Sequence, residues 1–231
     1  AARIPLQDGR NRSQMRAVIN VALGKGYERG QLRLGRSLGQ HYRFAFINFQ
    51  VWPPWDHSKD TPYAAKAAAI QYAITQGYTT VLWLDASCIV AGDLTQLFED
   101  IERDGVYMPS SGYNCAQTCN DKILEYFSIT RDQAELIPDA ATGCFGISTT
   151  HPKGIAFARM FIQAAKDGMF SRSRSHGGQS QAPRFLCQRQ DQSAAGLICH
   201  HLGIEKHDFG HRCGYYPKTT PTQVVQFKGI S

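Results

Sequence analysis

The sequence has no long hydrophobic run: nowhere in its 231 residues do roughly 18 or more apolar residues follow one another. A membrane-spanning helix is therefore not expected. A signal-peptide pattern is also missing, and the first residue is Ala, not Met. We accordingly expect the start of the chain to have been trimmed.

Cysteines are too irregularly spaced for a disulfide-rich scaffold. The seven cysteines are an odd number scattered between Cys88 and Cys213. Cys115 and Cys119 are separated by three residues, and no second Cys or His pair follows at the spacing of a zinc site. Neither a disulfide framework nor a zinc knuckle is therefore expected. A reducing compartment is expected, which favours a cytoplasmic protein.

Basic residues outnumber acidic ones, but no nucleic-acid-binding motif accompanies them. The formal net charge is +6 and the pI is about 9.0. We find no helix-turn-helix, zinc-finger or aromatic sheet motif, and the basic residues are spread along the chain. Nucleic acid is therefore not expected as a partner. The positive charge favours anionic ligands such as phosphates.

Hydrophobic residues make up 42% of the chain, enough for one large α/β domain with a buried core. Residues 1–16 are polar and basic without a period, so we expect a loose arm there and a single domain over 17–231. Apolar runs predict strands at 17–24, 44–49, 81–90, 106–108 and 224–229, and a loop of small residues running into a strand over 137–147.

Helical spacing and capping residues predict the segments between these strands. Two capping boxes are expected, formed by Asp93 with Gln96 and by Thr130 with Gln133. Residues 109–120 are expected to form a loop, and 170–184 either a lid or a surface loop. Helices are expected after the first strand as far as Leu38, from Thr61 and Pro62 to Gly77, over 94–101, from Pro152 to Gly168, and from Asp191 to Gly203.

The apolar run over 81–90 is interrupted by a single carboxylate, Asp85. Burying an unpartnered polar group costs about 2–7 kcal/mol, so Asp85 is most stable at the carboxyl end of its strand. Open α/β sheets bind ligands in the crevice at those ends. A functional carboxylate is therefore expected, the alternative being an Asp that caps the next turn.

Three other segments carry candidate site residues. Gly24 to Tyr27 form a glycine turn that allows close backbone approach to a ligand, and Tyr27 can stack on a base. Lys66 is either solvated or in contact with a phosphate or carboxylate at the crevice. The glycines of 137–147 admit an acceptor ligand or form a turn with a bulge. Asp191 and Gln192 begin a helix, where a carboxylate either complements the helix dipole or serves the site.

The order of these motifs resembles that of nucleotide-sugar glycosyltransferases of the GT-A fold, including small bacterial and viral members. The resemblance covers roughly residues 17–229. The motifs that carry it are the strand and glycine turn at 18–26, Pro62-Tyr63 to Lys66, Leu82-Trp83-Leu84-Asp85-Ala86-Ser87, Thr142-Gly143-Cys144-Phe145-Gly146, and Asp191-Gln192-Ser193.

The resemblance implies a three-layer α/β/α fold with a mixed, mostly parallel central sheet. It also implies a nucleotide-sugar donor, with UDP expected as the nucleotide, and a glycan or other hydroxyl acceptor. Residues implied to contact the nucleotide are Ala22, Leu23, Gly24, Tyr27, Lys66, Asp85, Ala86 and Lys228. Gly143 and Cys144 are implied to contact the acceptor, and Asp191 and Gln192 to be catalytic.

A divalent metal, Mn²⁺ or Mg²⁺, is implied on the family's Asp-x-Asp motif. Here that motif is Asp85-Ala86-Ser87, so a hydroxyl replaces the second carboxylate. Many relatives add a C-terminal His ligand, whereas the matching stretch here, Gln226 to Gly229, has none. Mg²⁺ or Mn²⁺ can bind through one carboxylate together with phosphates and water. Asp85 and Ser87 are therefore the expected metal ligands.

In the expected reaction a metal on Asp85, helped by Lys66 or Lys228, stabilises the charge of the departing diphosphate. Asp191 acts as a base on the acceptor hydroxyl if the anomeric centre inverts. If configuration is retained, Asp191 or Gln192 stabilises the oxocarbenium-like centre. Two alternatives remain: a phosphohydrolase with Asp85 as nucleophile, and a non-catalytic module that binds nucleotide sugars or glycans.

Overall fold

A five-stranded sheet forms the centre of the molecule, in the order β2-β1-β3-β8-β5. The computed structural model describes residues 15–41, 44–55, 63–170, 180–217 and 220–230, so most of the expected arm lies outside it. The strands are β1 (Arg16–Val21), β2 (Ala45–Phe49), β3 (Thr80–Leu84), β5 (Val106–Tyr107) and β8 (Cys144–Ser148).

The sheet is mixed. β1 pairs in parallel with β2 and β3, whereas β8 runs antiparallel to both β3 and β5. All strands except β8 therefore point the same way, which confirms the predicted mixed, mostly parallel sheet.

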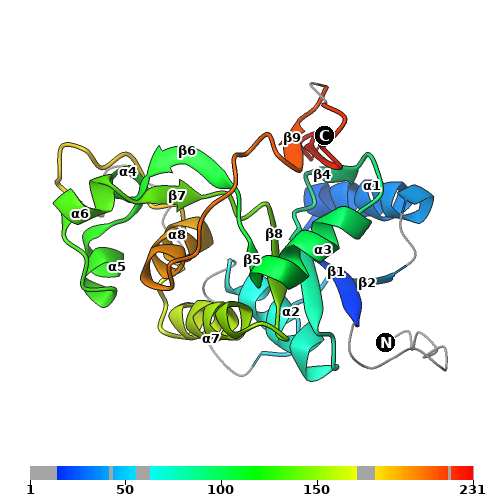
Figure 1. Cartoon of the computed structure of the whole chain (residues 1–231), viewed down its shortest axis with the longest axis horizontal. Helices are drawn as coiled ribbons and strands as arrows, with labels where there is room; N and C mark the ends of the chain where they lie inside the picture. The colour runs from blue at the N-terminus through cyan, green and yellow to red at the C-terminus, as the bar shows by residue number, and fades with distance from the viewer. Residues whose placement is uncertain (1–14, 42–43, 56–62, 171–179, 218–219, 231) are drawn as a thin grey trace.

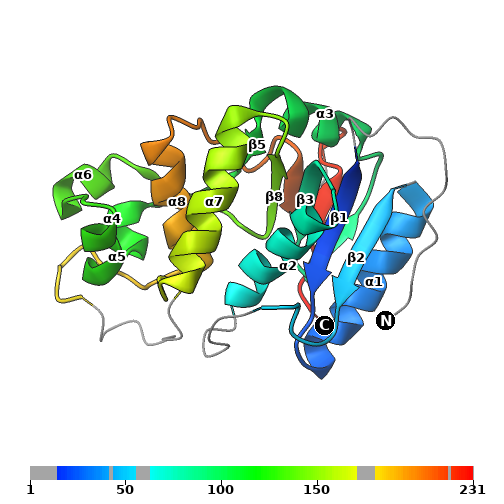
Figure 2. The same ribbon diagram turned by 90° about the horizontal axis from the view of Figure 1, so that it is seen from below.

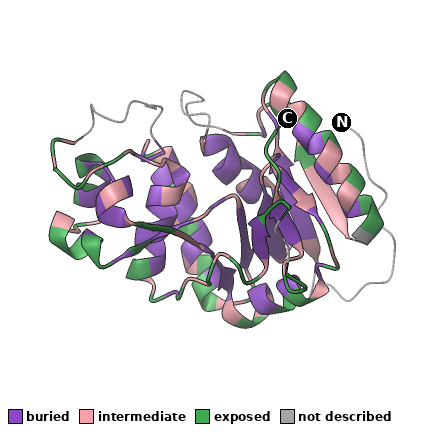
Figure 3. Ribbon diagram, turned by 90° about the horizontal axis from the view of Figure 1, so that it is seen from above, coloured by how far each residue is buried: buried purple, intermediate pink, exposed green. Residues whose placement is uncertain are grey.

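Helices cover both faces of this sheet, giving the predicted three layers (Figure 2). β3 is buried on both sides, and its alternate residues enter two separate cores. Val81 and Trp83 pack with one helix pair, and Leu82 and Leu84 with the other. The first pair is α2 (Ala64–Thr75) and α7 (Pro152–Lys166), and the second is α1 (Lys25–His41) and α3 (Thr95–Asp104). Figure 3 shows the buried strands between the more exposed helix surfaces.

A second, mostly helical part lies beside the sheet (Figure 1). It is joined to the sheet by α7 and by the core that α7 shares with α8. Its elements are β6 (Ser110–Asn114), α4 (Cys115–Thr118), α5 (Asp121–Tyr126), α6 (Arg131–Glu135), β7 (Pro138–Ala140) and α8 (Asp191–His201). Within the described residues, every helix is too short or too polar to cross a lipid bilayer.

The C-terminal stretch returns to the end of β3 through a small sheet. Here β10 (Val225–Phe227) lies between β4 (Cys88–Val90) and β9 (Cys213–Tyr215). The Lys228 backbone N–H donates to the Ser87 carbonyl at 2.8 Å, and the Arg33 guanidinium donates to the Gly229 carbonyl. This sheet therefore places the predicted C-terminal stretch beside Asp85-Ala86-Ser87.

Several predicted boundaries were wrong. Residues 109–120 form β6 and α4 instead of a loop, because β6 pairs with β7. The apolar run over 81–90 is divided at Asp85 into β3 and β4, which belong to different sheets. Thr61 and Pro62 lie outside the described residues, and α2 begins at Ala64.

The two predicted capping boxes have different outcomes. Thr130 and Gln133 form theirs at the start of α6. Asp93 instead accepts hydrogen bonds from the backbone N–H and the hydroxyl of Thr95, and α3 begins one residue after Leu94. The predicted box with Gln96 was therefore wrong, although Asp93 still stabilises the start of the helix.

Candidate active site

A cavity of about 890 Å³ opens at the carboxyl ends of β1 and β3. This is the position at which open α/β sheets bind ligands. Eight of the residues predicted from the sequence line it: Leu23, Tyr27, Lys66, Asp85, Ala86, Ser87, Asp191 and Gln192.

Asp85 follows β3 directly, and its side chain is 41% exposed. Its backbone N–H donates to the Gly143 carbonyl at 2.8 Å, and its own carbonyl accepts from the Cys88 N–H at 2.9 Å. Its side-chain Oδ1 accepts from the Trp83 indole N–H at 2.6 Å. Backbone hydrogen bonds therefore form the turn after β3, so the Asp85 side chain is not needed to cap it. The carboxylate instead lines the cavity.

Lys66 is a buried cation between two carboxylates. Its ammonium donates to Asp191 Oδ2 at 2.6 Å and to the Thr142 carbonyl at 2.8 Å, and lies 3.5 Å from Asp85 Oδ1. The same group lies 4.9 Å from the centre of the Trp83 ring. Burial lowers the pKa of Lys66, but the charges of Asp191 and Asp85 outweigh burial and raise the pKa above its usual value. Lys66 is therefore held charged and is not solvated.

Asp191 begins α8 and is almost fully buried. Its Oδ2 accepts from both Lys66 and the Thr142 hydroxyl, each at 2.6 Å. The preceding residue, Gln190, has φ +50, a conformation that costs about 1–3 kcal/mol in a residue other than glycine. The fold retains this strain at the point where α8 enters the cavity.

Gln192 and Arg189 extend the site beyond Asp191. The Gln192 amide donates to the Ala140 carbonyl at 2.8 Å, and its oxygen accepts from the Arg189 guanidinium at 3.1 Å. Both side chains line the cavity. The Arg189 guanidinium thus adds a positive charge to a cavity in which Lys66, Asp85 and Asp191 together carry one net negative charge.

The other predicted residues do not line the cavity. Ala22 is fully buried, and Gly24 has φ +108, which lets the chain turn into α1. Cys144 is fully buried in the core between the sheet and α3, so its predicted contact with an acceptor is not supported. A Cβ atom at Gly143 would lie 2.4 Å from the Phe227 ring and 3.2 Å from Asp85 Oδ2, so Gly143 packs closely against both side chains. Lys228 is exposed, and its ammonium lies over the Tyr216 ring.

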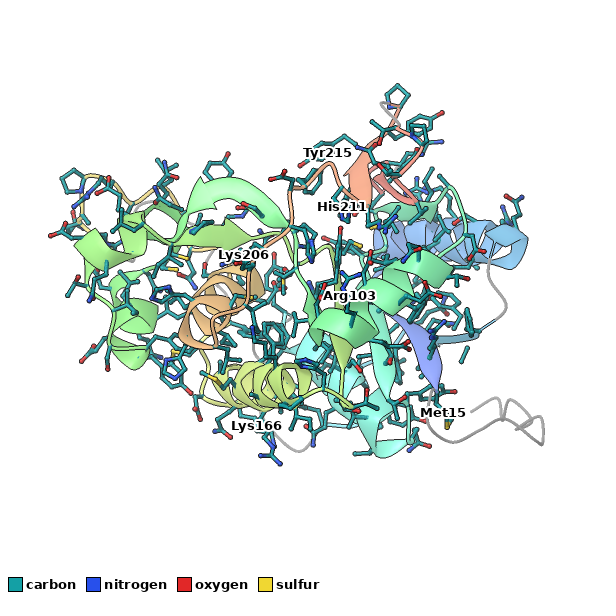
Figure 4. The ribbon with its side chains drawn as sticks, viewed as in Figure 1. Met15, Arg103, Lys166, Lys206, His211 and Tyr215 are labelled. Carbon is teal, nitrogen blue, oxygen red and sulfur yellow. The ribbon has the colours of Figure 1, made fainter. Side chains whose placement is uncertain are left out.

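Histidines are absent from the lining of this cavity in the described residues. His207 stacks on Tyr107 with ring centres 4.7 Å apart, and His211 stacks on His207 in turn. Figure 4 shows His211 on the segment that connects α8 to β9.

The oxygen atoms that Asp85 and Ser87 supply are enough to bind a hard dication only if a phosphate adds further ligands. No cluster of three or more His, Cys, Asp or Glu side chains able to hold a metal occurs in the described part of the chain. Asp85 supplies one carboxylate at the cavity, and Ser87 adds a hydroxyl. Magnesium sites of one or two carboxylates are usually completed by substrate phosphates and water. Asp85 and Ser87 would therefore hold Mn²⁺ or Mg²⁺ jointly with a bound diphosphate.

Some residues of the cavity were not predicted from the sequence. Trp83 and Thr142 donate hydrogen bonds to Asp85 and Asp191 respectively, and Arg189 lies two positions before Asp191. Tyr63, Trp83 and Thr142 lie within motifs that carry the resemblance, but no role was predicted for them, and Trp52 lies outside every predicted motif. The unpredicted lining residues are Val21, Trp52, Tyr63, Ala65, Trp83, Thr142, Arg189, Gln190 and Ile230.

No protein-family model matches the chain, and no curated protein matches it in sequence. Among solved structures, the chain is similar to mouse xyloside xylosyltransferase 1 in its apo form, with a TM-score of 0.51 and 8% identity over 91% of this chain and 96% of that one. It is also similar to a glycosyltransferase involved in the glycosylation of the major capsid of PBCV-1, with a TM-score of 0.48 and 10% identity over 92% of this chain and 91% of that one. The likeness to the xylosyltransferase confirms that this chain has the predicted glycosyltransferase fold.

Proposed function

We propose that this protein transfers a sugar from a nucleotide-diphosphate donor, first among them a UDP-sugar, to a hydroxyl acceptor. The observation that carries this proposal is the cluster of Lys66, Asp85 and Asp191 in a large cavity at the end of β3. The glycosyltransferase fold is consistent with it. A cavity of about 890 Å³ lies within the range of small-molecule sites.

The lining of the cavity suggests how the donor lies. Leu23, Tyr27 and Ile230 form an apolar and aromatic end that suits a nucleobase. Asp85, Ala86 and Ser87 follow at the carboxyl end of β3, where the diphosphate would bind. Mn²⁺ or Mg²⁺, held by Asp85 and Ser87, would neutralise charge on the diphosphate when bound.

Asp191 would act on the sugar ring. Because its Oδ2 accepts two hydrogen bonds and faces the Lys66 ammonium, its negative charge is fixed in position. A fixed negative charge stabilises the positive charge that develops at the anomeric carbon. We therefore favour this electrostatic role for Asp191 over that of a base, and assign Lys66 and Thr142 to positioning it.

The test is nucleotide release from a panel of UDP- and GDP-sugars, with and without Mn²⁺. We expect release by the wild type, and a loss of about 10²-fold in Asp85→Asn and in Asp191→Asn, because each variant removes a charge aimed at the reacting groups. Asp208→Asn, at an exposed position away from the cavity, is the matched control. Equal turnover by all four proteins would refute the assignment.

The same assay separates the two alternative functions. A phosphohydrolase would release inorganic phosphate from monoesters, but Asp85 follows the third strand in chain order, whereas such nucleophiles usually follow the first. A non-catalytic module would bind a nucleotide sugar without releasing sugar-free nucleotide. Either result would replace the proposal of sugar transfer.

A further inference from the structure

A second cavity, of about 530 Å³, adjoins the first. Tyr63, Arg189 and Gln190 line both, so the two spaces meet at the start of α8. Two of these shared residues, Arg189 and Gln190, directly precede Asp191 in the chain. A ligand in the second cavity would therefore approach the sugar end of the donor.

Gln188 lines this second cavity and carries an unsatisfied hydrogen-bond donor. The residue is only 4% exposed, and its side-chain oxygen accepts from the Asn120 backbone N–H at 2.7 Å. Its side-chain nitrogen is buried and has no hydrogen-bond partner among the described residues. Buried donors in native proteins are normally paired, so an unpaired one at a cavity wall indicates a ligand atom that accepts from it.

Aromatic and apolar side chains form the remaining walls. The Tyr113 ring is 44% exposed, with the Arg189 guanidinium 5.5 Å from its centre. Leu186 is 47% exposed beside it. Flat apolar surfaces with a few convergent polar groups suit a ligand that has apolar faces and polar edges. A pyranose ring has both, because its faces carry C–H groups and its edge carries hydroxyls.

We infer that the second cavity binds the acceptor, and that the acceptor is a saccharide whose hydroxyl oxygen accepts from Gln188. This rests on the proposed function and replaces Gly143 and Cys144 as acceptor residues. In the transfer, the acceptor oxygen bonds to the anomeric carbon as the bond from that carbon to the diphosphate oxygen breaks. The electron pair remains on the diphosphate, which takes up the hydroxyl proton.

The test is saturation-transfer NMR of the whole chain with a mixture of methyl pyranosides and, separately, a peptide containing Ser and Thr. We expect signals from the sugar ring protons and none from the peptide. Gln188→Glu keeps an oxygen for the Asn120 N–H but removes the amide donor, and should weaken sugar binding about tenfold, or about 1.4 kcal/mol. Tyr113→Ala removes an exposed ring and should abolish binding. Tyr126→Ala, on α5, is the control and should bind as the wild type does.

Thermal melting of each variant establishes that it is folded, and Tyr113→Ala keeps the test decisive if Gln188→Glu unfolds. Sugar binding that persists in Tyr113→Ala, or binding of the peptide alone, would overturn the inference. Failure here is distinguishable from failure of the proposed function. A wild type that releases nucleotide but binds no sugar refutes only the acceptor site, whereas sugar binding without nucleotide release refutes only the donor reaction.

Discussion

Lys66 is the residue on which the geometry of the site depends. It is the buried cation that faces both Asp85 and Asp191, and its ammonium also donates to the Thr142 carbonyl. Removing one member of a buried ion pair leaves the other uncompensated in a medium that solvates it poorly. The same contact that positions the site therefore also contributes to folding.

We expect Lys66→Met to lower the free energy of unfolding by about 3–5 kcal/mol, because Asp191 would remain buried without its counter-ion. Urea denaturation measures this. The double variant Lys66→Met with Asp191→Asn should recover part of the loss, since both charges are then absent. Lys122→Met, at an exposed position, is the control. If Lys66→Met alone is as stable as the wild type, the ion pair between Lys66 and Asp191 does not stabilise the folded protein.

Asp139, fully buried on β7, predicts a dependence of stability on pH. Burial raises the pKa of Asp139 to about 6, against the opposing effect of the nearby hydrogen-bond donors Ala140 and Ser111. In the unfolded chain the pKa of this carboxyl is about 4. The folded state therefore binds the proton more tightly. The stabilisation that protonated Asp139 contributes to the folded state is complete below about pH 4 and is lost as the pH rises through about 6.

Asp139→Asn cannot make this transition. Its free energy of unfolding relative to the wild type should therefore increase by about 2–3 kcal/mol between about pH 4 and pH 7. Urea denaturation of both proteins across this range measures the difference. A constant difference would mean that Asp139 titrates alike in the folded and unfolded states.

Metal binding should depend on the nucleotide, because Asp85 and Ser87 supply too few ligands alone. In isothermal titration we expect Mn²⁺ to bind the wild type measurably only when UDP is present. By linkage, Mn²⁺ should then tighten UDP binding, by about tenfold. Asp85→Asn should lose this gain. Tight binding of Mn²⁺ to the protein without nucleotide, or an undiminished gain in Asp85→Asn, would contradict the shared site.

Sequence patterns predicted residues with a local signal and missed those that depend on folding. Asp85 stands out as the single carboxylate in an apolar run, and Asp191 begins a recognisable helix. The contact between Lys66 and Asp191 joins residues 125 positions apart, so no local pattern reveals it. The error at Cys144 has a similar cause: β8 is buried on both faces, and its sequence does not tell which face meets the cavity.

At the scale of elements, α1 determines the position of the motif that follows β3. Gly30 of α1 lies so close to this motif that a Cβ atom there would be 2.3 Å from the Ala86 carbonyl oxygen. That contact is with backbone and cannot be relieved by rotating a side chain. The glycine thus allows α1 to pack directly against Asp85-Ala86-Ser87.

Gly30→Ala should displace the motif, weaken UDP binding at least about tenfold and lower the free energy of unfolding by about 1–3 kcal/mol, as overpacking does. Gly39→Ala on the same helix is a matched control, because its Cβ atom would meet nothing within 4 Å. It should stabilise the protein by about 0.5–1 kcal/mol. Titration calorimetry and urea denaturation test both variants. Equal effects of the two substitutions would refute the packing argument.

Elements with strong periodicity were predicted well, and those formed by long-range pairing were not. The strands of the central sheet and the long helices follow from apolar runs and caps. β6 and α4 were missed because residues 109–120 are rich in Ser, Gly, Asn and Cys, and β6 exists only through its pairing with β7. The final strand was predicted, but its place beside β4 depends on the whole fold.

At the scale of the whole molecule, the first cavity lies where the sheet meets the helical part. α1, α2 and the end of β3 supply Tyr27, Lys66 and Asp85 around one side, and α8 supplies Asp191 and Gln192 from the other. Because α7 and α8 share one core with the sheet, the two sides of the cavity are held in a fixed relation. A donor bound between them would contact both parts at once.

A crystal structure with UDP and Mn²⁺ bound tests the central claim most directly. We expect the diphosphate at Asp85 and Ser87, the base between Tyr27 and Ile230, and Asp191 still paired with Lys66. A nucleotide bound away from this cavity, with Asp85 in contact with no part of it, would contradict the account.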